Sequence, residues 1–196
     1  MNRTNYHFGN LKETILNEAL KQLKNNGLNE LSFRLIAKNI GVAPSAPYNH
    51  FDSKDHLLQE IIFKGQKSLM EKMKINKYKS ESPSQQLAFV GKAYLNFSIE
   101  NKELFNLMFS EKNKELIMLT DKIVLLFKEI ISNKFKEGKR FRVTEKGASI
   151  TAWSMIHGLS SIVNKMNKDK FEKKIEKNLT EIFIEMSAIW GKGVTN

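Results

Sequence analysis

The sequence predicts an all-α fold in which short helices near the N-terminus lead into longer ones. The 196 residues include only three prolines and ten glycines. Leucine, isoleucine, lysine and glutamate, which are common in helices, are abundant. Apolar residues also recur at steps of three and four along most of the chain, which is the period of an amphipathic helix.

The first two helices can be bounded from their apolar stripes and their caps. In "LKETILNEALKQLKNNG" a stripe runs from Leu11 to Leu23, and Gly27 follows as a C-terminal cap. In "SFRLIAKNIG" Ser32 is the expected N-cap and Gly41 ends the helix. A short helix that ends at Gly41 and meets a second short helix there, with Val42 packing under the turn, is typical of a helix-turn-helix unit.

The next stretch, "GVAPSAPYNHF", is expected to form the second helix of that unit. Pro44 and Pro47 would lie in its first turn, where backbone N–H groups have no intrahelical partner and the fixed φ of proline is already helical. Tyr48 and His50 would then be able to donate hydrogen bonds to phosphate oxygens. Phe51 would return to the core.

A longer helix and then a loop complete the N-terminal half. Ser53 is the expected N-cap, and Asp55 lies in the first turn, where the helix dipole favours negative charge. The segment "KINKYKSESPSQQ" is polar, contains Pro83 and lacks apolar periodicity, so we predict a loop. This loop is the best domain boundary, and it separates a domain at 6–70 from one at 71–193.

The C-terminal part predicts a helical bundle. After "QQLAFVGKAYLNFSIEN" and "KELFNLMF", helices are expected at about 114–136, 144–166 and 170–190. The last helix carries an apolar stripe wide enough to face two neighbours at once. Its members are Phe171, Ile175, Leu179, Ile182, Phe183, Met186, Ile189 and Trp190.

Composition excludes several classes of protein. The absence of cysteine rules out a disulfide scaffold, a thiolate zinc site and a cysteine nucleophile, and it fits a reducing cytoplasm. With no long uncharged run and a polar N-terminus, the expectation is a soluble cytoplasmic protein that does not span a membrane. The net charge of +11 is spread along the chain, so it fits either a nucleic-acid partner or a lysine-rich composition.

The motifs of common enzymes and metal sites are also missing. The sequence has no glycine-rich phosphate loop, no recognisable pair of carboxylates and no supported Ser/His/Asp arrangement, so we expect no catalytic residues and no cofactor. The spacing of His50 and His56 does not place two ligands on one helical face, so no metal site is expected.

Residues 6–61 resemble the DNA-binding domain of TetR-type (TetR/AcrR) bacterial transcriptional regulators. The opening "YHFGNL" and the later "WSMIHGL" are similar to a subfamily whose C-terminal domain is called WHG. The positions that carry the resemblance to the DNA-binding domain are Ala19, Gly27, Ser32, Phe33, Arg34, Ile36, Ala37, Gly41, Val42, Tyr48, His50, Phe51, Ser53, Lys54, Leu57 and Leu58.

This resemblance implies a homodimeric regulator, most simply a repressor, that binds a palindromic operator in double-stranded DNA. Ser32 and the adjacent amide of Phe33, together with Tyr48, His50 and Lys54, would hold phosphates. The bases would be reached by Arg34, Ser45 and Asn49.

In the C-terminal domain, the resemblance implies a small-molecule effector and a dimer interface. Trp153 and His157 share one helical face. Gly158 lies beside them and would allow the backbone of another helix to approach closely. Trp153 and His157 either pack in the core where two helices cross or provide a polar group in a largely apolar ligand cavity. The sequence does not distinguish these two roles. Phe97, Phe105, Met108 and Phe109 would line that cavity, and Ile175, Leu179, Ile182 and Met186 would form the dimer interface.

Two other classes remain as alternatives. The first is a helical hydrolase, and the second is a basic protein that lies on a membrane surface. The second is disfavoured because the helices carry core-sized apolar stripes with caps.

Overall fold

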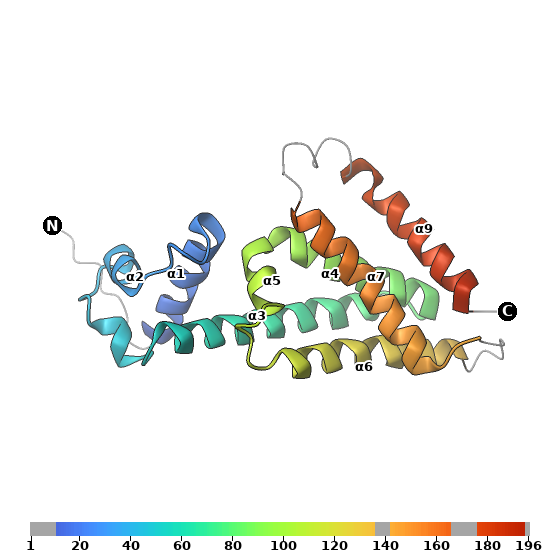
Figure 1. Cartoon of the computed structure of the whole chain (residues 1–196), viewed down its shortest axis with the longest axis horizontal. Coiled ribbons are helices and arrows are strands. Elements are labelled where there is room, and N and C mark those ends of the chain that lie inside the picture. The colour runs from blue at the N-terminus through green and yellow to red at the C-terminus, as the bar shows by residue number, and fades with distance from the viewer. Residues whose placement is uncertain (1–10, 136–141, 166–175, 195–196) are drawn as a thin grey trace. The chain divides into compact units, whose positions relative to one another are not determined.

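The computed structural model describes residues 11–135, 142–165 and 176–194, and within these ranges the regular structure is entirely helical, as predicted (Figure 1). The helices are α1 (Leu11–Asn26), α2 (Phe33–Ile40), the 3₁₀ helix η2 (Ala46–Asn49), α3 (Lys54–Lys77), α4 (Pro83–Glu100), α5 (Lys102–Met108), α6 (Leu116–Phe135), α7 (Glu145–Lys165) and α9 (Glu176–Val194).

The chain forms two compact units. The first holds the described residues up to Gly65 together with Glu103–Lys114. The second holds Gln66–Lys102 and the described residues from Glu115 onward. Helix α3 therefore contributes its first half to one unit and its second half to the other.

The caps expected in the first unit are present. Gly27 and Gly41 have φ values of 79° and 73°, in the left-handed region that favours glycine, directly after α1 and α2. Ser32 caps α2 by accepting a hydrogen bond from the Leu35 amide at 3.2 Å. Ser53 does the same for α3 by accepting from the His56 amide at 3.0 Å. Between the helices lies a core that includes Ile15, Leu23, Ile36, Phe51, Leu57 and Ile61.

The second helix of the helix-turn-helix unit is shorter than the sequence predicts. It is one turn of 3₁₀ helix, with Pro47 in its first turn, while Pro44 lies in the preceding turn and outside the helix. The Ala46 and Tyr48 amides donate to carbonyls three residues earlier, at 2.9 and 3.1 Å. Because Pro47 has no N–H, it cannot donate to the carbonyl of Ala43, which interrupts an α-helical ladder across this segment.

Helix α5 packs tightly on α3 within the first unit. A Cβ atom placed on Gly65 would lie 2.7 Å from Sδ of Met108 and 2.9 Å from Cδ1 of Leu104. Glycine at position 65 therefore permits a close contact that a large branched residue would force apart. The contact is extended by Gln59, which donates to the Lys112 carbonyl at 2.8 Å.

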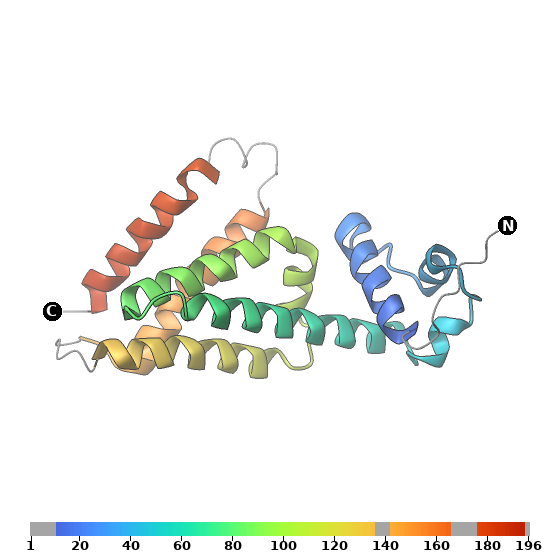
Figure 2. The same cartoon turned by 180° about the vertical axis from the view of Figure 1, so that it is seen from behind.

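The second unit is a bundle in which α4, α6 and α7 pack on one another, and α9 contacts α4 and α7. The second half of α3 runs alongside α6 (Figures 1 and 2). Lys77 on α3, only 7% exposed, is paired with Glu129 on α6. The end of α9 is tied to the start of α7, because Trp190 Nε1 donates to the Ala148 carbonyl at 3.3 Å.

The start of α4 differs from the prediction. Pro83 opens α4 instead of lying in a loop, because a proline in the first turn of a helix loses no hydrogen bond. Helices α6 and α7 confirm the two long helices predicted before the last one. Residues 166–175, which include the predicted start of the last helix, lie outside the described part of the chain.

Candidate functional site

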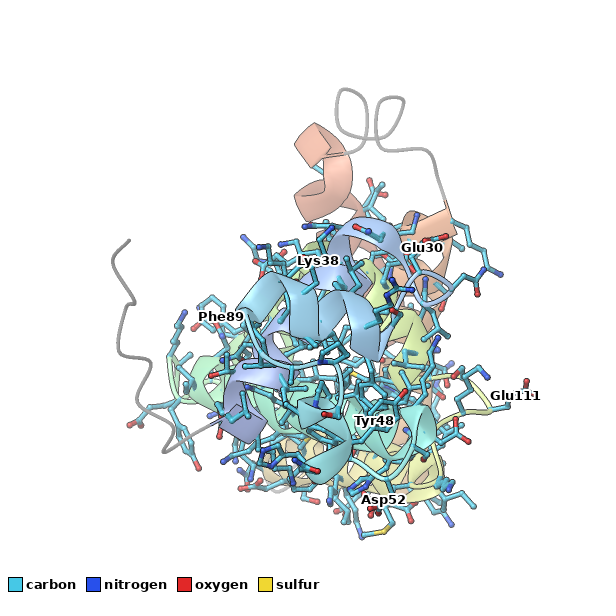
Figure 3. All side chains as sticks on the ribbon, turned by 90° about the vertical axis from the view of Figure 1, so that its left-hand side faces the viewer. Glu30, Lys38, Tyr48, Asp52, Phe89 and Glu111 are labelled. Atoms are coloured by element: carbon cyan, nitrogen blue, oxygen red, sulfur yellow. The ribbon has the colours of Figure 1, made fainter. Side chains whose placement is uncertain are left out.

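The polar side chains predicted to meet DNA occur on the helix-turn-helix unit of the first unit. Figure 3 views this unit end-on, with Tyr48 turned toward the reader. Most of these side chains are exposed and His50 is half-buried. The exposed ones are Ser32, Arg34, Ser45, Tyr48, Asn49 and Lys54.

Tyr48 is held by its ring and presents its hydroxyl outward. Its ring meets that of Phe33 edge-on, with the centroids 4.7 Å apart, and Phe33 in turn stacks on Phe51 at 6.4 Å. Tyr48 is 57% exposed, whereas Phe33 is 8% exposed. The side chain of Phe33 therefore supports Tyr48, and only the backbone amide of Phe33 remains for the phosphate contact that the sequence suggests.

Two of the predicted phosphate ligands already have intramolecular partners. The hydroxyl oxygen of Ser32 accepts from the Leu35 amide, which leaves its own proton free to donate. Lys54 Nζ donates to the Leu28 carbonyl at 3.4 Å, which is long for a hydrogen bond. Because an ammonium group has three donors, Lys54 can keep this contact and still reach a phosphate.

A second candidate site lies between α4 and α7 in the second unit. The hydroxyl of Tyr94 and Nδ1 of His157 are hydrogen-bonded at 2.7 Å. The ring of Trp153 lies 5.5 Å from that of His157, one turn earlier on α7. The shared face of Trp153 and His157 was predicted, but Tyr94 was not, since it lies 63 residues earlier in the chain.

Burial keeps both partners of this bond uncharged. Desolvation lowers the pKa of His157 below its ordinary value, so the imidazole is neutral at pH 7. Desolvation also raises the pKa of Tyr94 far above its ordinary value, and the neighbouring Trp153 indole offsets part of that effect. The site therefore offers hydrogen bonds and no formal charge from this pair.

One stripe of α7 carries buried polar atoms without partners. Five buried side-chain polar atoms in the described residues lack a hydrogen bond of ordinary geometry, and three of them are Trp153 Nε1, Ser160 Oγ and Asn164 Nδ2. With His157 these residues follow at steps of three and four, which places them on one face. Ser160 and Asn164 are 0% and 5% exposed. The same spacing in the sequence was a signal that could have added them to the predicted site.

The other residues predicted to line a ligand cavity are divided between the two units. Phe97, which is buried, belongs to the same unit as Trp153 and His157. Phe105 and Met108, both buried, belong to the first unit, as does Phe109, whose ring is tilted by 47° to that of Phe105 with the centroids 4.8 Å apart. Among the described residues, no atom would lie within 4 Å of a Cβ atom placed on Gly158, so the second backbone expected close to it is not found there.

The predicted dimer residues lie in and before α9. Ile182 and Met186 are half-buried, and Ile189, one turn further along the same face, is 68% exposed. Ile175 lies outside the described residues, and the side chain of Leu179 is likewise not described. Among the described residues, no group of three or more His, Cys, Asp or Glu side chains is placed to hold a metal ion. No described helix is long and apolar enough to cross a membrane.

Comparison with known proteins agrees with this geometry. Residues 15–61, which run from α1 into α3, match the family described as bacterial regulatory proteins, tetR family. The chain is 26% identical over 172 residues to the uncharacterized HTH-type transcriptional regulator YobS of Bacillus subtilis, covering 85% of this chain and 84% of YobS. It is also 26% identical over 194 residues to the nucleoid occlusion factor SlmA of Vibrio cholerae, covering 91% of this chain and 95% of SlmA.

Solved structures share the fold. A protein of unknown function from Rhodococcus sp. RHA1 superposes with a TM-score of 0.82 at 20% identity, covering 98% of this chain and 100% of that one. AibR, solved in complex with isovaleryl coenzyme A and operator DNA, superposes with a TM-score of 0.61 at 16% identity, covering 80% of this chain and 88% of AibR. Residues 15–61 are therefore a helix-turn-helix domain of the tetR family of bacterial regulatory proteins, in a chain with an all-α fold.

Proposed function

We propose that the protein is a homodimeric repressor that binds a palindromic operator and is released from it by a small molecule. The observation that carries the proposal is the exposed polar surface of the helix-turn-helix unit, where Tyr48 is fixed by Phe33 with its hydroxyl outward. One turn of 3₁₀ helix reads few base pairs, so two copies related by a two-fold axis would be needed for specificity.

In this proposal the contacts fall into two groups. Ser32, the amide of Phe33, Tyr48, His50 and Lys54 hold phosphates and set the register of the protein on the duplex. Arg34, Ser45 and Asn49 reach base edges in the major groove. Because only three side chains read bases, the shape and deformability of the DNA should contribute much of the specificity.

The effector would bind in the C-terminal domain, for which 71–193 remains our proposed extent, with the DNA-binding domain at 6–70. Ser160 Oγ and Asn164 Nδ2 on α7 support this placement, since a buried donor without a partner costs about 1–3 kcal/mol and a ligand acceptor would remove that cost. The uncharged state of His157 and Tyr94 favours a largely apolar, uncharged molecule with a polar group. The similarity of Trp153, His157 and Gly158 to the WHG motif agrees with this domain type.

Lys54→Ala tests the proposed DNA contacts. In a mobility-shift titration on the promoter beside the protein's own gene, this variant should bind more weakly. The slope of log affinity against log salt should also fall by about one unit per subunit, because one phosphate contact is lost. Lys92→Ala, an exposed lysine on α4 in the other unit, is the matched control and should change neither quantity. An unchanged affinity and slope for Lys54→Ala would rule out the phosphate contact.

The effector site is tested by the same titration, repeated with candidate compounds, and by fluorescence. In a Trp190→Phe variant the emission of Trp153, then the only tryptophan, should respond to the compound that releases the DNA. His157→Phe should weaken that response without weakening operator binding. A compound that releases DNA while Trp153 emission stays constant would place the effector elsewhere. A regulator would act in the cytoplasm, where bacterial DNA lies. The mobility-shift titration also separates a regulator from a hydrolase, because only the regulator should bind the duplex. Liposome flotation tests whether the protein lies on a membrane surface.

A further inference from the structure

A groove outside the α4–α7 site crosses the second unit between α3 and α6. Its volume is about 490 Å³, within the range of small-molecule sites. Both helices run alongside one another there (Figures 1 and 2). The lining residues are Gln66, Lys67, Met70, Glu71, Lys74, Leu119, Lys122, Leu125, Leu126 and Glu129.

The groove is long and its apolar part is incompletely covered. The lining residues run from Gln66 to Lys74 on α3 and from Leu119 to Glu129 on α6. At the rise of an α-helix, these stretches are about 12 Å and about 15 Å long. Met70, Leu119 and Leu126 form an apolar strip, and Leu125 beside them is 62% exposed. Exposed leucine at the edge of such a strip gains from being covered by an apolar chain.

The charges on the rim are unbalanced. Lys67, Lys74 and Lys122 are exposed. The ion pairs of the described residues use other lysines, namely Lys12, Lys21, Lys64, Lys72 and Lys77. Of the two acidic residues in the lining, Glu129 is already paired with Lys77, which leaves Glu71 against three ammonium groups. An occupant with a negative head group would correct this imbalance.

We infer that this groove binds a single-chain amphipathic anion of the fatty-acid class. Its hydrocarbon chain would lie along Met70, Leu119 and Leu126, where it would cover Leu125. Its carboxylate would lie among the rim lysines, at the end near Lys67 and Lys122. A cation of the same shape would meet the three ammonium groups and be repelled. The inference does not depend on the effector site on α7 or on operator binding.

The experiment uses the full chain with decanoate as the probe and decyltrimethylammonium as its cationic counterpart. With methionine methyl groups labelled with ¹³C, decanoate should shift the Met70 resonance saturably, with a Kd of about 100 µM. Met70→Leu assigns the resonance. Met73 is the internal control, since it lies on the same helix, is fully buried and does not line the groove, so its resonance should not move. Decyltrimethylammonium should shift neither.

The charge dependence is tested with matched variants. Lys67→Glu combined with Lys122→Glu should weaken decanoate binding about tenfold or more, since two attractive charges become repulsive. Lys92→Glu combined with Lys128→Glu makes the same change in net charge at exposed positions outside the groove, and it should leave the affinity within about twofold. All four substitutions are at exposed residues, and circular dichroism should be unchanged.

Three outcomes of the titrations would overturn the inference, and one outcome of the variants would do so as well. The first is a Met70 resonance that does not respond to decanoate, and the second is an equal response to both probes. The third is an acidic peptide of alternating aspartate and leucine that saturates the Met70 shift at lower concentration than decanoate, which would make the groove a peptide site. Equal weakening by both double variants would show attraction to the net charge of the protein and would also count against the groove.

Discussion

At the scale of single residues, Tyr48 combines a fixed ring with an exposed hydroxyl. The ring is 4.7 Å from that of Phe33, so Tyr48→Phe should preserve the packing and remove only the hydroxyl. Loss of one hydrogen bond to phosphate should weaken binding by about 0.5–1.5 kcal/mol, or roughly two- to twelvefold. Fluorescence anisotropy with an operator duplex and a scrambled duplex measures this effect.

The loss for Tyr48→Phe should be the same for both duplexes, because a phosphate contact carries no sequence information. Arg34→Ala is the contrasting variant, and it should reduce the preference for the operator over the scrambled duplex. A Tyr48→Phe variant that loses affinity for the operator alone would make Tyr48 a base-reading residue instead.

His157 gives a second prediction at this scale, because burial lowers its pKa. Because its pKa is lower in the folded protein, His157 binds fewer protons in the folded state than in the unfolded state. Its contribution to stability is therefore complete above about pH 6.5, the ordinary histidine pKa. The contribution is lost as the pH falls through the pKa of the folded state. The melting temperature should therefore fall more between about pH 7 and pH 5 in the wild type than in His157→Gln. An equal fall in both proteins would show that His157 is not the group responsible.

At the scale of helices, the sequence predicted well where the signal is local. Ser32, Gly27 and Gly41 bound α1 and α2 as expected, since a cap depends on the residue itself and its close neighbours. The single turn of η2 was not predicted. The two prolines favour a helix start, but Pro47 also removes a donor from so short a segment.

The role of Gly65 could not be read from the sequence, because the contact that requires it comes from α5, about forty residues later in the chain. Two substitutions there have different expected effects. Gly65→Ala should be close to neutral, since alanine is about 1 kcal/mol more favourable in a helix, and the atoms it meets are the flexible ends of Met108 and Leu104.

Gly65→Val should cost about 1–3 kcal/mol, because the larger branched side chain must displace Met108 and Leu104 from their packed positions. Chemical denaturation of the purified variants gives the comparison. Gly158→Val is the matched control on α7, where a Cβ meets no described atom within 4 Å, and it should be close to neutral, since valine is no poorer a helix former than glycine. Equal costs at the two glycines would show that the α3–α5 contact yields easily.

At the scale of the whole molecule, the sequence does not show which helices pack on one another. A boundary was expected in the loop around Pro83, where composition changes. In the structure, residues 103–114 belong to the first unit and the second half of α3 to the second. Such a division depends on which apolar faces meet, and the periodicity of a single helix does not specify its partner. The same reason explains why Tyr94 was missed as the partner of His157, while the shared face of His157 and Trp153 was predicted.

Assembly gives the last prediction. Ile182 and Met186 are half-buried and Ile189 is 68% exposed, all on one face of α9, so this face has apolar surface available for a second copy. Met186→Asp combined with Ile189→Asp should give monomers by sedimentation. The monomers should bind a palindromic operator weakly, because a single helix-turn-helix unit contacts only one half-site. Ala188→Asp, exposed on a different face of α9, should remain dimeric. A double variant that keeps native circular dichroism and still sediments as a dimer would assign the interface to other helices.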